Sequence, residues 1–140
     1  MNLEQQVCSL ELAKLLKELG VKQESAFWWE QTKLAGRNIW SKEWALQFNN
    51  YSEPYNKDHI VSAFTAVELG DMLPITIDAG TAGKGISSEL LSIHKGTFEK
   101  GDRWQVMYYD VNFCNAVTEA DARAKMLIYL LKKNLLSLQP

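Results

Sequence analysis

The chain has 140 residues, of which 46% are hydrophobic and 23% charged, with eight glycines and three prolines. This composition is typical of a globular protein and excludes a disordered or fibrous chain. At this length a chain buries enough surface to fold without a metal or a disulfide. We therefore expect a single domain over residues 1–140.

The charges are balanced, with 15 basic and 17 acidic residues and a formal net charge of -2. Proteins that bind the phosphates of nucleic acids normally have an excess of basic residues or a basic stripe on one face. A nucleic-acid-associated module is therefore a weaker hypothesis than a protein-binding role. The two cysteines, Cys8 and Cys114, lack CxxC spacing, and no long apolar run or signal-peptide pattern is present. We expect a cytoplasmic protein without a membrane segment.

The first predicted element is a helix that begins after Ser9. Leu12, Leu16 and Leu19 recur at helical spacing, and Gly20 ends the helix because glycine accepts a left-handed conformation. The segment resembles the first half of a helix-turn-helix. The following residues, AFWWEQ, make a poor recognition helix, because basic and amide side chains do not recur at successive turns.

Residues 25–48 contain two aromatic runs separated by LAGRN, which predicts a β-hairpin. A helical turn over SKEWALQF is the alternative. A polar, proline-containing loop follows to residue 59. Thr65 and Glu68 then form a capping-box pattern, and Pro74 ends a short middle helix. The glycine-rich stretch after it predicts a turn region between strands.

Extended runs at about 88–95 and 103–110 are separated by GTFEKGD, and a third short run covers 112–116. Strands joined by short turns pair antiparallel. The expected order is α-β-β-α-β-β-β-α. The sequence thus predicts an α+β fold, with a small antiparallel sheet packed against two longer helices and a short middle helix.

The final helix is predicted to start at the cap residue Thr118, with acidic residues in its first turn and lysines in its last. Its main apolar stripe consists of Ala120, Ala124, Leu127, Ile128 and Leu131. We expect this stripe to pack against the protein's own sheet. A dimer seam is the alternative, because Met126, Tyr129 and Leu130 lie off the stripe and widen the apolar arc.

No motif assigns a catalytic, cofactor-binding or metal-binding residue. GTAGKGISS lacks the spacing of a phosphate loop and of a dinucleotide fingerprint. A zinc site needs the convergence of Cys8, His59, His94 and Cys114, and His59 beside Asp58 is the one candidate for acid–base work. A small-molecule enzyme therefore ranks third among the functional hypotheses.

The most unusual feature is a cluster of aromatic residues, with eight of the fifteen between residues 27 and 55. Neighbouring residues of a strand face opposite sides, so only one of Trp28 and Trp29 enters the core. Tryptophan and tyrosine favour protein interfaces and also stack on nucleic-acid bases. The candidate partner contacts are Trp28, Trp29, Tyr51 and Tyr55, with packing inside the protein as the alternative.

VCSLELAKLLKELGVKQES, VSAFTAVELGDMLP and TEADARAKMLIYLLKKNLL together resemble a group of small proteins encoded by bacteriophages and integrated mobile elements. The last segment is also similar, more weakly, to phage α/β sandwich domains. The resemblance implies no activity and no cofactor. We expect a non-enzymatic accessory protein that acts through contacts with an unknown protein or a second copy of itself.

Overall fold

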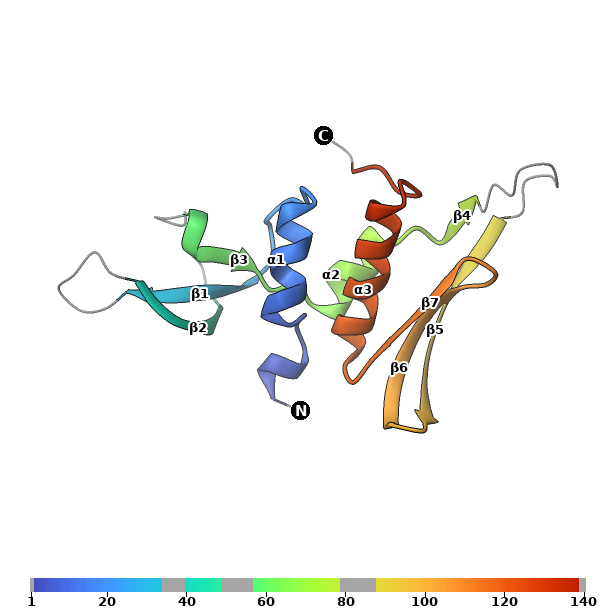
Figure 1. Cartoon of the computed structure of the whole chain (residues 1–140), viewed down its shortest axis with the longest axis horizontal. Coiled ribbons are helices and arrows are strands. Elements are labelled where there is room, and N and C mark those ends of the chain that lie inside the picture. The colour runs from blue at the N-terminus through green and yellow to red at the C-terminus, as the bar shows by residue number, and fades with distance from the viewer. Residues whose placement is uncertain (1, 34–39, 49–56, 79–87, 139–140) are drawn as a thin grey trace.

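The computed structural model describes residues 2–33, 40–48, 57–78 and 88–138. Within these residues, three α-helices lie between two antiparallel sheets (Figure 1). The fold is α+β, as the sequence predicts. It differs from the expected arrangement because the strands form two sheets, one on each side of the helices (Figure 1).

The helices are α1 (Leu10–Glu18), α2 (Ala66–Met72) and α3 (Glu119–Lys132), with 3-10 turns η1 (Leu3–Gln5) and η2 (Lys57–His59). The first sheet has the order β2-β1-β3 and consists of β1 (Phe27–Lys33), β2 (Trp40–Phe48) and β3 (Ile60–Ser62). The second has the order β4-β5-β6-β7 and consists of β4 (Thr76–Asp78), β5 (Ser88–Phe98), β6 (Gly101–Tyr108) and β7 (Asn112–Ala116). The predicted hairpin at 25–48 is confirmed, and SKEWALQF is a strand. The short strands β3 and β4 are additions to the predicted order.

The ends of the helices follow the local sequence signals. Gly20 ends α1 with a φ of +87°, and Thr65 with Glu68 forms a complete capping box at α2. Thr118 caps α3 by accepting a hydrogen bond from the backbone N–H of Asp121. Ser9 occupies the capping position of α1, but its side chain makes no capping bond.

Two carboxylates join separate elements at the helix starts. Asp121 Oδ1 accepts a 2.7 Å hydrogen bond from the backbone N–H of Ser9, so the first turn of α3 holds the start of α1. Glu68 accepts hydrogen bonds from Ser25 Oγ and the Ala26 N–H, which hold the entry to β1 against α2. Each carboxylate lies three residues after a capping threonine. Thr65 follows β3, and Thr118 follows β7. One sequence pattern therefore serves both strand-to-helix junctions.

The hydrophobic core lies along α3, which contacts α1, α2 and the strands β6 and β7. Met126, Leu127 and Leu130 are completely buried. The predicted packing of α3 against a sheet is confirmed, but Met126 and Leu130 do not lie on a free side of the helix. Because other elements surround α3 on several sides, the buried arc is wider than one stripe.

No helix in the described part of the chain has the length and apolar character needed to cross a bilayer.

Candidate functional site

Trp28 and Trp29 lie on opposite faces of the β1–β3 sheet. Trp29 packs against the core, and its Nε1 donates a 3.1 Å hydrogen bond to the carbonyl oxygen of Cys8. Trp28 is half-buried on the other face, opposite Gln47 of β2 and Ser62 of β3. The expectation that only one of the two enters the core is confirmed. A partner role for Trp28 stays a prediction, and Tyr51 and Tyr55 lie outside the described residues.

His59 is held by two other residues of the aromatic region. Its ring stacks on Trp40, with centroids 3.8 Å apart and planes 12° from parallel. Its Nδ1 lies 2.7 Å from Gln31 Oε1, while Gln31 Nε2 donates to the Ser41 carbonyl oxygen. Since the amide oxygen only accepts, Nδ1 of His59 carries the hydrogen and donates it to Gln31.

The four residues considered for zinc are distributed over different parts of the fold. Cys8 is buried, and its backbone N–H donates a hydrogen bond to the carbonyl oxygen of Phe64. Cys114 lies on the inner side of β7, against the core. His94 is exposed on β5, on the opposite side of the second sheet. Among the described residues, no cluster of three or more potential metal ligands is present.

Burial makes both thiols weak acids. It raises the pKa of the Cys8 thiol to about 12. Burial also raises the pKa of Cys114, while Lys125 opposes the shift. Because the thiolate is the reactive form, both cysteines are poor nucleophiles in the folded protein.

The raised thiol pKa predicts a loss of stability at alkaline pH. Above about pH 9 an unfolded thiol loses its proton while folded Cys8 keeps it, so the folded state binds more protons and the free energy of unfolding falls with pH. Tyr108, with a pKa raised to about 12 by burial, acts in the same direction. Urea unfolding at about pH 8, 9.5 and 10.5 should show the decline. Cys8→Ala should flatten it, and an unchanged slope in that variant would contradict the assignment.

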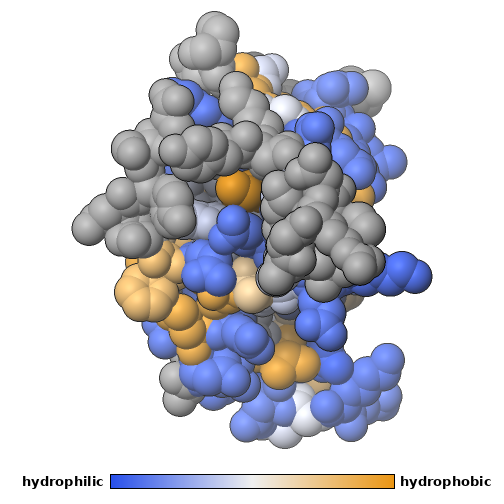
Figure 2. All heavy atoms as spheres, turned by 90° about the vertical axis from the view of Figure 1, so that its left-hand side faces the viewer, coloured by the Kyte–Doolittle hydropathy of each residue, from blue (hydrophilic) through white to orange (hydrophobic). Residues whose placement is uncertain are grey.

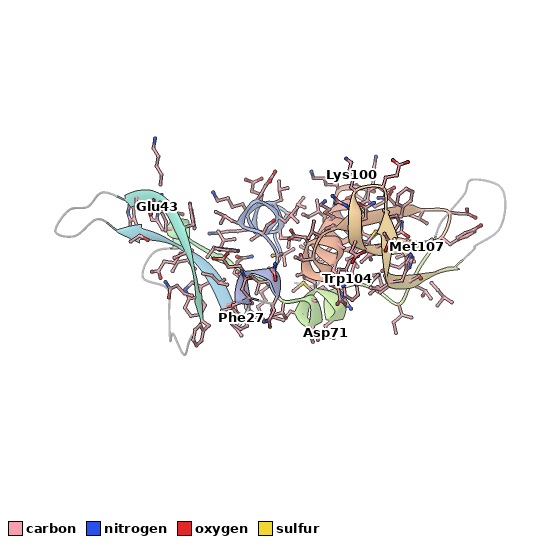
Figure 3. The ribbon with its side chains drawn as sticks, turned by 90° about the horizontal axis from the view of Figure 1, so that it is seen from below. Phe27, Glu43, Asp71, Lys100, Trp104 and Met107 are labelled. Carbon is pink, nitrogen blue, oxygen red and sulfur yellow. The ribbon has the colours of Figure 1, made fainter. Side chains whose placement is uncertain are left out.

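The second sheet has an inner side that packs on the helices and an outer side that does not. Val106 and Tyr108 are buried on the inner side, and Trp104 lies toward the helices while Met107 lies on the far side (Figure 3). Strand alternation and pairing assign the remaining residues. The outer face consists of Thr76, Leu90, Ser92, His94, Gly96, Phe98, Arg103, Gln105, Met107, Phe113 and Asn115.

The outer face combines four large apolar side chains, Leu90, Phe98, Met107 and Phe113, with polar residues of which few are charged. Leu90 and Phe113 are 64% and 60% exposed. Of the residues named for the outer face, Arg103 alone carries a permanent charge, although charged residues make up 23% of the chain, and the pairing of β4 with β5 adds Asp78 at the end of the sheet. The Nε of Arg103 is shielded from water and has no hydrogen-bond partner within the described residues. Protein surfaces ordinarily mix both charges, whereas interface centres are depleted of lysine and acidic residues and enriched in aromatic residues, methionine and arginine.

The opposite end of the molecule has a different surface. On β2, the charged residues Lys42 and Glu43 are exposed together with Phe48. Viewed from this end, the visible surface mixes hydrophobic and hydrophilic side chains (Figure 2). The outer face of the second sheet is therefore the stronger candidate for a binding surface. The sequence did not reveal it, because its members are spread over four strands.

Comparisons of the chain with protein-family models, curated proteins and solved structures give no match. The candidate site therefore depends on the chemistry of its own residues. Because α1 is followed by the strand β1, the fold replaces the helix-turn-helix interpretation. The glycine-rich stretch at residues 80–85 lies outside the described residues.

Proposed function

We propose that this chain is a non-enzymatic accessory protein that binds another protein chain through the outer face of the β4–β7 sheet. The observation that supports the proposal is the composition of that face, where exposed Leu90 and Phe113 flank Met107 without a covering element among the described residues. Burying each such side chain contributes about 1.5–3 kcal/mol. A few well-packed apolar anchors supply most of the affinity in typical protein interfaces.

Arg103 supports a protein partner in a second way. Arg103 is partly exposed on the outer face, and its guanidinium can donate to a carbonyl or carboxylate oxygen of a partner. Arginine beside aromatic side chains is also common at the centres of interfaces. The outer face thus combines apolar side chains with an arginine that can donate to a partner.

A phage or mobile-element origin is part of the proposal, and its support is the resemblance of the three helical segments. We also propose the cytoplasm as the compartment, because Cys8 and Cys114 are free thiols and free cysteines persist in reducing compartments.

The test is co-purification of the tagged full-length chain from its native host, with variants that separate the two ends of the molecule. Phe113→Asp should remove a bound protein, because it replaces an exposed apolar side chain beside Met107 with a charge. Val67→Asp is the matched control. Val67 is 73% exposed in the first turn of α2, where an acidic residue favours the helix, and it lies outside the outer face.

Loss of the bound protein in Phe113→Asp but not in Val67→Asp would support the proposal. Trp28→Ala tests the predicted contact on the first sheet by the same readout. Partner loss in Trp28→Ala alone would move the binding surface to the β1–β3 sheet and overturn the assignment to the outer face. Recovery of nucleic acid in place of a protein would contradict the proposal.

A further inference from the structure

We infer that the partner of the outer face is a second copy of this chain, packed face to face. This inference rests on the proposed function, because it names the occupant of the same surface. The two-fold axis of such a dimer would bring two identical outer faces together, so the surface has to complement itself in shape, hydrogen bonding and charge.

The shape requirement is met by the twist of the sheet. Antiparallel strands twist with a fixed hand, so two copies of the β4–β7 sheet have the same twist by construction. Twisted sheets of the same hand pack face to face at about 30°, with their side chains interdigitated in a layer about 10 Å thick. Leu90, Met107 and Phe113 are large apolar side chains suited to such a layer.

The hydrogen-bonding groups of the outer face also complement one another. His94, Gln105 and Asn115 are cross-strand neighbours on β5, β6 and β7. An amide or a neutral imidazole both donates and accepts, so a row of these groups can pair with an identical row. The amide oxygens of Gln105 and Asn115 on one copy can accept hydrogen bonds from the partly exposed Arg103 of the other.

The charge of the outer face favours a like partner. Surfaces that recognise a different protein commonly carry a charge pattern opposite to that of the partner. Here the permanent charges among the described residues of the outer face are Arg103 and, at the end of β4, Asp78, which are opposite in sign, so two copies meet with little net repulsion. A strongly charged partner would find little to match on this surface.

The area of the outer face is sufficient for a weak dimer. Four strands about 4.8 Å apart span roughly 19 Å, and the 11 residues of β5 reach about 36 Å. Since β4 and β7 are shorter, each copy offers about 500 Å², or roughly 1,000 Å² for the pair, which is the lower limit for a specific interface. We therefore expect a reversible dimer with a dissociation constant of about 1–100 μM.

Sedimentation equilibrium of the purified full-length chain between about 1 and 500 μM tests the inference. The wild type and Val67→Asp should shift from monomer mass to twice that mass as concentration rises. Phe113→Asp and His94→Glu should stay monomeric, because each places two carboxylates in the closed layer. His94 is exposed, so His94→Glu leaves the fold intact even where Phe113→Asp does not, and circular dichroism checks both.

Monomeric wild-type protein at every concentration would overturn the inference, as would a dimer that persists in both variants. Neither result decides the proposed function, which depends on the co-purification experiment. A monomeric chain that still loses a different bound protein through Phe113→Asp would retain the proposed function and exclude the second copy as partner.

Discussion

Glu68→Ala is expected to lower the free energy of unfolding by about 3 kcal/mol. Glu68 accepts hydrogen bonds from the N–H and hydroxyl of Thr65, the Ser25 hydroxyl and the Ala26 N–H, at 2.7 to 3.1 Å. Its loss would open the capping box of α2 and release the start of β1 at the same time. Urea unfolding at neutral pH measures the change.

Two variants show whether the loss comes from these hydrogen bonds. Glu68→Gln keeps the length of the side chain and one accepting oxygen, so we expect about half of the destabilisation. Glu99→Ala removes an exposed glutamate at the β5–β6 turn and should change stability by less than about 0.5 kcal/mol. Equal stabilities for Glu68→Ala and Glu99→Ala would show that Glu68 does not hold the junction.

Met126→Ala should lower the free energy of unfolding by about 3 kcal/mol, because Met126 is fully buried on α3 and its truncation leaves a cavity in the core. The sequence pattern placed Met126 off the main apolar stripe, on a side of α3 that a partner could cover. The structure buries it in the same cluster as Leu127 and Leu130. Thermal or urea unfolding measures the loss of stability, which would be small if Met126 lay on an exposed side of α3.

Leu131→Ala is the control for Met126→Ala. Leu131 belongs to the predicted stripe, yet it is only partly buried against the core, so its truncation should cost about 1 kcal/mol. Both variants place alanine within α3, and leucine and methionine have similar helix propensities. The difference between the two variants therefore reports side-chain packing. A larger loss for Leu131→Ala than for Met126→Ala would contradict the packing of α3 described above.

The functional assignment also changes between sequence and structure. In the sequence the aromatic residues between 27 and 55 stand out, because their concentration is visible along the chain. In the fold, Trp29 packs against the core and hydrogen bonds to Cys8, and Trp40 stacks on His59. These contacts give two of the aromatic side chains a structural role within the protein. Trp28 remains the predicted partner contact of this region.

The outer face of the second sheet could not be predicted from the sequence, for a physical reason. Leu90 and Phe113 are 23 residues apart along the chain and are separated by β6 in the sheet. Strand alternation assigns each residue to one of two sides, but it does not say which side the helices cover. That choice depends on which side of the sheet α3 packs against.

The sequence by itself determined the local features of this protein: the left-handed end of α1 at Gly20, the capping box at Thr65, the cap at Thr118, the hairpin strands and the α+β class. These features depend on interactions between residues close along the chain, whose energies do not require the rest of the fold. The tertiary structure decided the division into two sheets, the burial of Met126 and the exposure of the outer face. Each of these depends on contacts between distant segments, which compete for the same apolar surface and are settled only when the whole chain is packed.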